Sequence, residues 1–256
     1  MRNGAGANVI ARLENTALAF GSRIILRNCT LDIVEGAITC IIGLSGAGKS
    51  TILRLIDGLL LPSEGHVFVR DQDICHVSEE QRNVIRQKIS LSFQFSALLD
   101  SLSVGDNVAL PLREHTRLTH AEIHRTVMDA LDSVGLANAY DALPGELSGG
   151  MLKRAGFARA IVTRPELVLY DEPTTGLDPI VTNLITDTIL RLRDKLAGTA
   201  VVISHDLDSI FAMADYVAML FEGAIIAYDT AAAIRSSTNP IVQQFLAGAE
   251  TGPIPI

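Results

Sequence analysis

The segment Gly43–Thr51 constrains the possible fold of this chain more than any other part of its sequence. It reads Gly-Leu-Ser-Gly-Ala-Gly-Lys-Ser-Thr, which contains the pattern G-x-x-x-x-G-K-S, and it directly follows the apolar run Ala37–Ile42. Such a run is typical of a buried parallel strand, and this pattern binds phosphate when a strand precedes it and a helix follows. The sequence therefore predicts a strand, a glycine-rich loop and a helix that begins at Lys49.

The residue types in this loop suit the phosphates of a nucleotide. Glycines let the backbone curve without Cβ clashes, so that consecutive N–H groups face an anion at the helix N-terminus. We expect Lys49 to reach the β- and γ-phosphates and the Ser50 hydroxyl to ligate Mg²⁺. The predicted phosphate-binding residues are Gly43, Ser45, Gly46, Ala47, Gly48, Lys49, Ser50 and Thr51.

A second apolar run, Leu167–Tyr170, ends in the carboxylates Asp171 and Glu172. Acidic residues at the carboxyl end of a buried strand suit a ligand crevice at that edge of a sheet. We expect Asp171 to hold Mg²⁺ through its water shell and Glu172 to orient or deprotonate the attacking water. The alternative is an ordinary strand-end turn before Pro173, and the phosphate loop upstream disfavours it.

Short Ile- and Val-rich runs alternate with amphipathic segments, which indicates an α/β fold. The predicted strands are Thr16–Phe20, Leu31–Val34, Ala37–Gly43, Gly65–Val69, Ile89–Phe93, Leu167–Asp171, Ala200–Ser204, Val217–Phe221 and Ala224–Tyr228. The predicted helices begin at Lys49, Ser78, Thr119, Gly149, Pro179 and Leu207. Residues 95–163 show no convincing strand, so we expect a helical insertion there.

The composition excludes several classes of protein. Lys and Arg total 21 against 29 Asp and Glu, and this net charge of −8 argues against non-specific nucleic-acid binding. No apolar run approaches the length needed to span a bilayer. The three cysteines form no CxxC pair, which disfavours a disulfide scaffold or a zinc ribbon and fits a reducing cytosol.

A third motif, Leu147–Met151, reads Leu-Ser-Gly-Gly-Met and precedes the acidic strand. It resembles the signature of ABC-transporter ATPases, in which Ser148, Gly149 and Gly150 would complete a γ-phosphate site. Other elements of the family follow in order along the chain. The resemblance implies an adenine-stacking aromatic at Phe20, a Q-loop glutamine at Gln94, a D-loop aspartate at Asp178 and a switch histidine at His205.

This resemblance implies a P-loop NTPase fold: a RecA-like mixed sheet core, an antiparallel β subdomain and an inserted helical subdomain. It divides the chain into one ATPase domain, 1–236, and a C-terminal extension, 237–256. The domain consists of a core of 9–94 and 164–236 and a helical subdomain of 95–163. The implied catalytic residues are Glu172, His205, Lys49 and Gln94, and the implied Mg²⁺ ligands are Ser50, Gln94 and Asp171.

The family also implies a two-fold dimer in which each ATP lies between the phosphate loop of one subunit and Ser148 of the other. A single cassette is present, so a second copy is the simplest partner. In the extension, Pro240 is expected to start a short apolar helix. The last residues, 251–256, are expected to form an extended arm toward the second subunit, or else a frayed terminus.

Finer details resemble the ATPases of Mla-type lipid transport systems, which are associated with MCE proteins. These details are Phe93–Leu99, Asn107–His115, Asn239–Gly248, and Met151 where most cassettes have Gln. They imply an ATPase on the cytoplasmic face of the inner membrane that drives phospholipid transport between inner and outer membranes. The implied partners are an integral permease, a periplasmic MCE protein and a small STAS-domain protein.

Other kinds of cassette remain as alternatives. Cassettes of DNA repair and chromosome structure insert coiled coils or zinc modules between Gln94 and the signature, and translation-type members carry two cassettes; neither feature is present here. A cytosolic cassette for iron–sulfur assembly, or a different ABC exporter or importer, also remains open. An iron–sulfur cassette would not predict the Mla-like tail.

Overall fold

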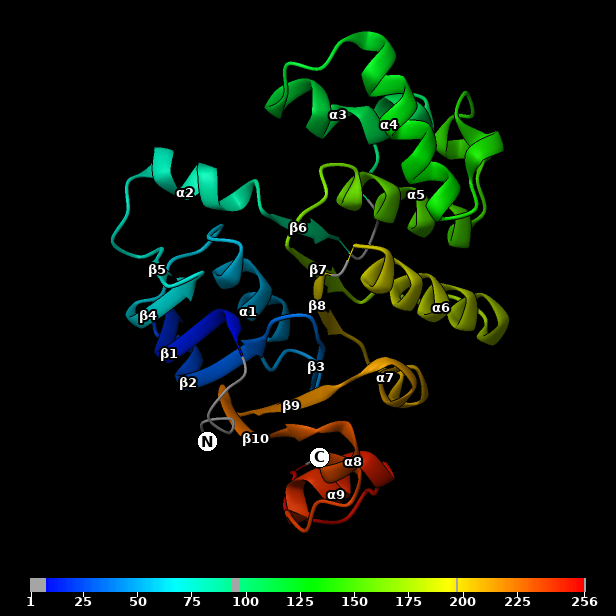
Figure 1. Ribbon diagram of the computed structural model, residues 1–256. Coiled ribbons are helices and arrows are strands. Elements are labelled where there is room, and N and C mark those ends of the chain that lie inside the picture. The colour runs from blue at the N-terminus through cyan, green and yellow to red at the C-terminus, as the bar shows by residue number, and fades with distance from the viewer. Residues whose placement is uncertain (1–7, 94–96, 197, 256) are drawn as a thin grey trace.

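The computed structural model describes residues 8–93, 97–196 and 198–255, which form two sheets with helices around them (Figure 1). The first sheet is four-stranded and antiparallel, with the order β2-β1-β4-β5. Its strands are β1 (Val9–Phe20), β2 (Arg23–Val34), β4 (Glu64–Val69) and β5 (Gln72–Asp73).

The second sheet is six-stranded, with the order β10-β9-β3-β8-β7-β6. Strands β9, β3, β8, β7 and β6 run parallel, and β10 is antiparallel to β9. Its strands are β3 (Ile38–Ile42), β6 (Ile89–Ser92), β7 (Leu167–Asp171), β8 (Thr199–Ile203), β9 (Tyr216–Phe221) and β10 (Ala224–Thr230).

Alternate residues of the central strands enter two separate cores. In β3, Cys40 and Ile42 pack into the core that includes the α5 residue Phe157, whereas Ile41 packs into the core shared with α1 and the antiparallel sheet. Both faces of the strand are therefore buried, and every residue of β3 is buried. This explains why the strand reads as a nearly continuous apolar run.

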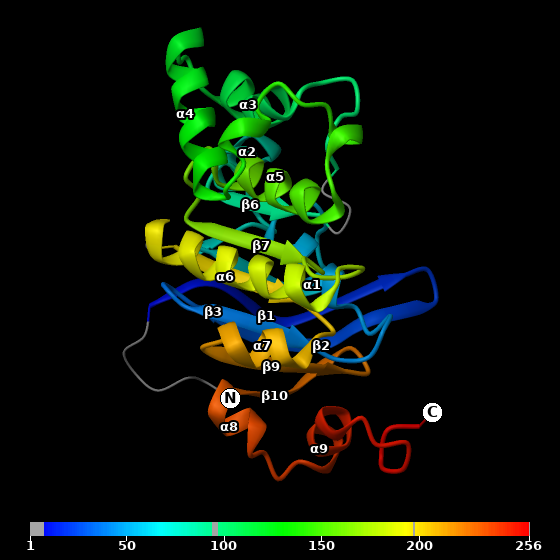
Figure 2. The same ribbon diagram turned by 90° about the vertical axis from the view of Figure 1, so that its right-hand side faces the viewer.

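The helices surround the two sheets. Helices α3, α4 and α5 lie together at one end of the molecule, and α8 and α9 lie at the other end beside β10 (Figures 1 and 2). None of the helices in the described segments is both long and apolar enough to cross a bilayer. The helices are α1 (Lys49–Ile56), α2 (Glu79–Arg86), α3 (Val104–His115), α4 (His120–Ser133), α5 (Gly149–Ile161), α6 (Pro179–Leu196), α7 (Leu207–Met213), α8 (Ala231–Arg235) and α9 (Pro240–Ala247), with short 3₁₀ turns at Ala137–Ala139 and Pro144–Glu146.

The mixed sheet, the antiparallel sheet and the helices agree with the α/β fold expected from the sequence. The described residues of 97–163 contain helices and no strand. The boundaries of the core, the helical insertion and the extension stay a prediction. Two strands are longer than predicted: Thr16–Phe20 is the end of β1, and Leu31–Val34 is the end of β2.

The C-terminal tail differs from the expected extended arm. The helix that starts at Pro240 is confirmed, with Asn239 as its N-cap and Val242 fully buried. Beyond it, Ile254 folds back and is only 5% exposed. The Ile254 N–H donates to Oε1 of Gln244 at 2.6 Å, and Nε2 of Gln244 donates to the Ile254 carbonyl at 3.3 Å. This side-chain amide pairs with the backbone as a neighbouring strand would, so the arm closes on its own chain. Contact with a second subunit stays a prediction.

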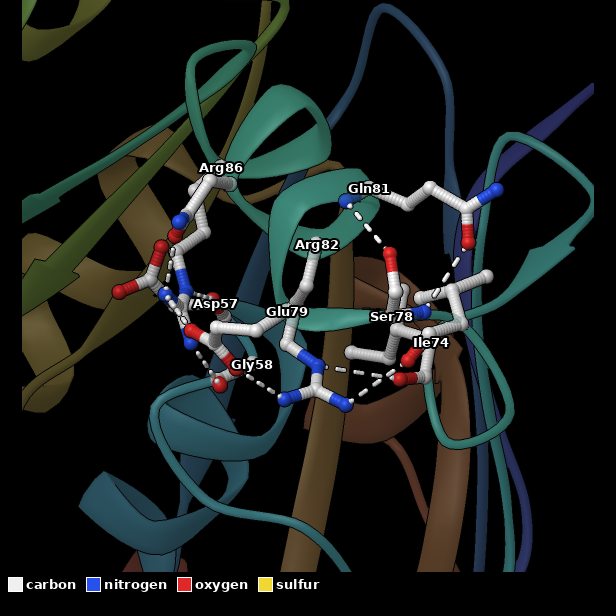
Figure 3. Close-up of polar contacts among 10 residues, drawn as sticks. Asp57, Gly58, Ile74, Ser78, Glu79, Gln81, Arg82 and Arg86 are labelled. Carbon is white, nitrogen blue, oxygen red and sulfur yellow. Dashed lines mark hydrogen bonds and ion pairs between the residues drawn. The ribbon is translucent and has the colours of Figure 1, made fainter.

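Two arginines of helix α2 hold it in place: Arg86 ties it to the end of α1, and Arg82 ties it to the loop after β5 (Figure 3). Arg86 donates to the carbonyl oxygens of Asp57, at 3.3 Å, and Gly58, at 2.7 Å. Arg82 donates to the carbonyl oxygen of Ile74 at 3.2 Å, and Glu79 accepts hydrogen bonds from both arginines. The guanidinium group of Arg86, near the C-terminal carbonyls of α1, is also favoured by the helix dipole.

The carboxyl group of Asp57 at this junction generates a stability prediction. Burial raises the pKa of Asp57 to about 7, although the charge of Arg86 opposes the rise. The unfolded pKa is about 3.9, so the folded chain holds a proton that the unfolded chain has lost between these values. Stability therefore falls as the pH rises from about 4 to 7. We expect Asp57→Asn to raise Tm by about 2–4 °C or more at pH 8, and to leave it nearly unchanged near pH 4.

Thermal unfolding followed by circular dichroism at both pH values measures the effect. Asp100→Asn changes an exposed carboxylate and serves as the control. Equal gains in Tm at the two pH values would show that titration of Asp57 does not control this stability.

Candidate active site

The phosphate loop adopts a backbone that only glycine allows at two positions. Gly43 follows β3 with φ +147°, and a Cβ atom there would lie 2.2 Å from the carbonyl oxygen of Leu220. Gly48 is the N-cap of α1 with φ +104°, and a Cβ there would lie 3.0 Å from the side chain of Ile25. These contacts explain why the loop between the strand and the helix carries glycine at both ends.

Lys49 is buried within this loop and only 6% exposed. Its ammonium group donates to the carbonyl oxygens of Gly43 at 2.9 Å and Leu44 at 3.0 Å. Burial lowers the pKa of Lys49, while the charges of Glu172 and Asp171 act in the opposite direction. The cation therefore lies at the N-terminal end of α1, where a bound phosphate would meet both its charge and the helix N–H groups.

The phosphate loop meets the acidic strand end through one hydrogen bond. The Ser50 hydroxyl donates to Oδ1 of Asp171 at 2.9 Å. Both groups offer the hard oxygen atoms that Mg²⁺ prefers, so Ser50 and Asp171 fit the roles predicted for them at such an ion. Bound there with a nucleotide, Mg²⁺ would neutralise charge on the phosphates.

Glu172 is held in one orientation next to this pair. Its φ is +52°, an uncommon value for a residue with a side chain, and its N–H donates to the carbonyl oxygen of Ile203 at 3.0 Å. Its carboxylate accepts a hydrogen bond from the Thr175 hydroxyl at 2.7 Å and lies 2.8 Å from Nε2 of His205. Only 7% of Glu172 is exposed, so this buried acceptor can orient or deprotonate a water in the cleft.

These groups line a cleft of about 500 Å³. Phe20 lies there and is 55% exposed, as an aromatic that stacks on a base must be. The predicted residues gathered in the cleft are Phe20, Ser45, Gly46, Gly48, Lys49, Ser50, Thr51, Glu172 and His205. Gly43 and Ala47 belong to the same loop without lining the cleft, and Gln94 lies outside the described residues.

The sequence reasoning missed several residues of this site. Arg23, Ile25 and Thr175 also line the cleft. Arg23 and Ile25 lie at the start of β2, directly after the turn that follows Phe20, so the position of Phe20 was the available signal. The buried ammonium group of Lys153, within the signature helix, donates to the carbonyl oxygen of Glu172 at 3.4 Å. No local pattern would have shown that long-range contact.

Four predicted residues lie away from the cleft of their own chain. Ser148 is the N-cap of α5 and accepts a hydrogen bond from the Met151 N–H at 3.3 Å; both Ser148 and Gly149 are exposed. Asp178 accepts hydrogen bonds from the first N–H groups of α6. A Cβ at Gly150 would lie 2.5 Å from the side chain of Val181, so the start of α5 packs directly against the start of α6.

Comparison with known proteins identifies the family. Residues 26–175 match the family described as ABC transporter. The chain belongs to this family. It is 40% identical, over 95% of its length and 90% of the relative's, to the intermembrane phospholipid transport system ATP-binding protein MlaF of Escherichia coli (strain K12). It is 37% identical, over 96% of its length and 71% of the relative's, to a Mycobacterium leprae protein named "Probable ribonucleotide transport ATP-binding protein mkl".

A solved structure supports the same assignment. The chain superposes with a TM-score of 0.79 and 30% identity on an ATP-binding cassette in a dimeric, post-hydrolysis state bound to ADP and Pi, covering 86% of this chain and 98% of the other. As an ABC ATPase, the chain binds ATP with Mg²⁺ and hydrolyses it to power a transporter. The individual roles of Glu172, His205, Ser50 and Asp171 stay predictions.

We expect Glu172→Gln to bind ATP as the native chain does and to hydrolyse it about 10²–10⁴-fold more slowly. The amide keeps the size of the side chain and can still accept a hydrogen bond from Thr175, but it is too weak a base to activate water. Nucleotide binding measured by titration calorimetry and phosphate release in the steady state separate the two effects.

Two further variants control this test. Lys49→Ala is expected to weaken nucleotide binding itself, because it removes a charged donor to the phosphates. Glu80→Gln, on the exposed face of α2, should change neither measurement. A Glu172→Gln rate close to that of the native chain would show that this carboxylate does not act on water.

Proposed function

We propose that this ATPase powers phospholipid transport between the inner and outer membranes. It would act at the cytoplasmic face of the inner membrane, held there by integral permease subunits. The observation that carries the proposal is the near full-length similarity to MlaF, with 95% of this chain and 90% of the relative aligned at 40% identity.

The Mla-like segment Asn107–His115 begins with a side chain that orders the residues before it. Asn107 is fully buried and accepts a hydrogen bond from the Leu99 N–H at 2.7 Å. Its amide nitrogen donates to the carbonyl oxygens of Leu99, Leu102 and Ser103 at 3.0 to 3.1 Å. One side chain thus ties the backbone of residues 99–103 to α3. We propose, from the similarity to MlaF, that the ATPase works with a periplasmic MCE protein and a small STAS-domain protein.

Two other assignments compete with phospholipid transport. The relatives named for ribonucleotide transport are nearly as similar at 37% identity, but this chain spans only 71% of the Mycobacterium leprae protein. The alignment with MlaF covers a larger share of the relative, 90% of its length. A cytosolic iron–sulfur cassette is the other alternative, and it would need no permease.

We also propose that two copies of the chain form the complete ATP site. Ser148 and Gly149 are exposed at the N-terminus of α5 and do not line the cleft of their own chain, although N–H groups at a helix start suit a phosphate. Ile180, beside Asp178, is 82% exposed, which is unusual for a large apolar side chain. A second copy that covers this surface would bring Ser148 to the opposite phosphate loop.

A mixture of two inactive variants tests this arrangement. Ser148→Arg and Lys49→Ala are each expected to abolish hydrolysis alone. In a mixed dimer with sites shared between subunits, both changes fall at one site and the other site is native. Activity measured after mixing should therefore recover in part. If mixed dimers form, as shown by differently sized tags, and no hydrolysis returns, the shared site is contradicted unless both sites must fire together.

Reconstitution of the membrane complex tests the transported substrate. The chain is purified with its permease from detergent-solubilised membranes and inserted into vesicles that contain a fluorescent phospholipid. We expect ATP-dependent movement of that phospholipid in the native complex and none in a complex with Glu172→Gln. ATP-dependent uptake of ribonucleotide with no lipid movement would favour the alternative of ribonucleotide transport. Recovery of the chain without any membrane subunit would favour the alternative of a cytosolic iron–sulfur cassette.

A further inference from the structure

Three metal-ligating side chains converge on the outer face of the antiparallel sheet, outside the ATP cleft. They are His66 on β4, Asp73 on β5 and His76 in the loop that leads to α2. Nδ1 of His66 and Nδ1 of His76 each lie 2.7 Å from Oδ2 of Asp73. In the described part of the chain, this is the one group of three or more His, Cys, Asp or Glu residues whose ligand atoms all lie within 4.8 Å of one another.

The hairpin backbone explains the convergence of these side chains. Strands β4 and β5 pair antiparallel, with Phe68 opposite Asp73, and a two-residue turn of positive φ at Arg70 and Asp71 joins them. His66 and Phe68 are two residues apart and share a face of β4, where their rings stack at 5.8 Å. The intervening Val67 is buried. The two imidazoles and the carboxylate therefore face outward together.

Asp73 is positioned so that one of its oxygens is available to both rings. Its Oδ1 accepts a hydrogen bond from the Cys75 N–H at 3.0 Å, which fixes the carboxylate in a local turn. The same turn carries His76 back toward the strand, where its ring lies 5.5 Å from the ring of His66. Oδ2 of Asp73 is left between the two Nδ1 atoms.

We propose that His66, Asp73 and His76 bind a zinc-class transition-metal dication. Two imidazole nitrogens and one carboxylate oxygen match the donors that zinc takes, with the fourth position left to water. Mg²⁺ and Ca²⁺ prefer sets made of oxygen atoms alone, so this site differs in kind from the one at Ser50 and Asp171.

The geometry needs only a small adjustment to hold the ion. In a tetrahedral zinc site with bonds of about 2.0 Å, neighbouring ligand atoms lie about 3.3 Å apart, so each ring must move outward by about 0.6 Å. The side chains of His66 and His76 are 48% and 70% exposed, which leaves them room to rotate. The ion would link β4, β5 and the start of the loop to α2, and none of its three ligands lines the ATP cleft.

Titration of the metal-free, untagged full-length chain with ZnCl₂ in excess Mg²⁺ tests the site, because Mg²⁺ occupies the oxygen donors of the ATP cleft. Calorimetry should give one zinc per chain with Kd of about 1 μM or tighter. At 100-fold excess over Kd, Tm should rise by about 5 °C or more. Substitution with Co²⁺ should produce the visible absorption of a site with nitrogen ligands.

Variants assign the binding to these residues. His66→Ala and His76→Ala should each weaken zinc binding at least about tenfold and remove the rise in Tm. His120→Ala removes an exposed imidazole elsewhere and should change nothing. Circular dichroism and ATP hydrolysis with Mg²⁺ should be unchanged in all three, which shows that they fold. No stoichiometric zinc binding by the native chain, or equal binding by the His66→Ala and His76→Ala variants, would overturn the proposal.

Discussion

The parallel pairing of β3, β8 and β7 is the constraint on which the site depends. Ile41 of β3 lies opposite Ile203 of β8, and Ile203 lies opposite Asp171 of β7. Parallel strands present their carboxyl ends at one edge of a sheet, so three loops must begin side by side. One becomes the phosphate loop, one carries Glu172, and one carries His205. The contacts from Ser50 to Asp171 and from His205 to Glu172 follow from that register.

Burial sets the electrostatics at this edge. Lys49 and Glu172 are both less than a tenth exposed, so neither charge is fully solvated by water. Each is instead held by directed contacts: Lys49 by two loop carbonyls, and Glu172 by Thr175 and His205. Buried charged groups interact more strongly with a ligand than solvated ones, because the effective dielectric constant around them is lower than that of water. Because these charges are buried, they need such hydrogen bonds and ion pairs in place of water. The backbone of Glu172 adopts a positive φ at the position where its carboxylate meets Thr175 and His205.

The parts of the fold that the sequence predicted correctly are those that local rules determine. The helices predicted to begin at Ser78 and Thr119 do begin there, because each of these residues caps its helix through hydrogen bonds with a residue three positions later. The buried parallel strands were visible as apolar runs. The first halves of β1 and β2 were missed, since these antiparallel strands alternate buried with exposed residues. Their pattern lacks a continuous apolar run.

Features that depend on distant pairing could not be predicted from the sequence. The fold-back of Ile254 depends on one amide, that of Gln244, and a sequence rich in proline and glycine predicted an extended arm instead. The contact of Lys153 with the backbone of Glu172 joins residues whose proximity depends on the packing of α5 on the sheet.

The proximity of His66 and Asp73 could not be predicted from the sequence either, although they lie only seven residues apart. His66 and Asp73 resemble no metal motif in sequence, and only the two-residue turn at Arg70 and Asp71 brings them to one face. A hairpin one residue longer would shift the register and send His66 and Asp73 to opposite faces of the sheet. The positive φ values at Arg70 and Asp71 therefore decide whether these side chains can meet. In this chain the phosphate loop follows from a motif of consecutive residues, whereas the candidate metal site depends on a turn that pairs two strands.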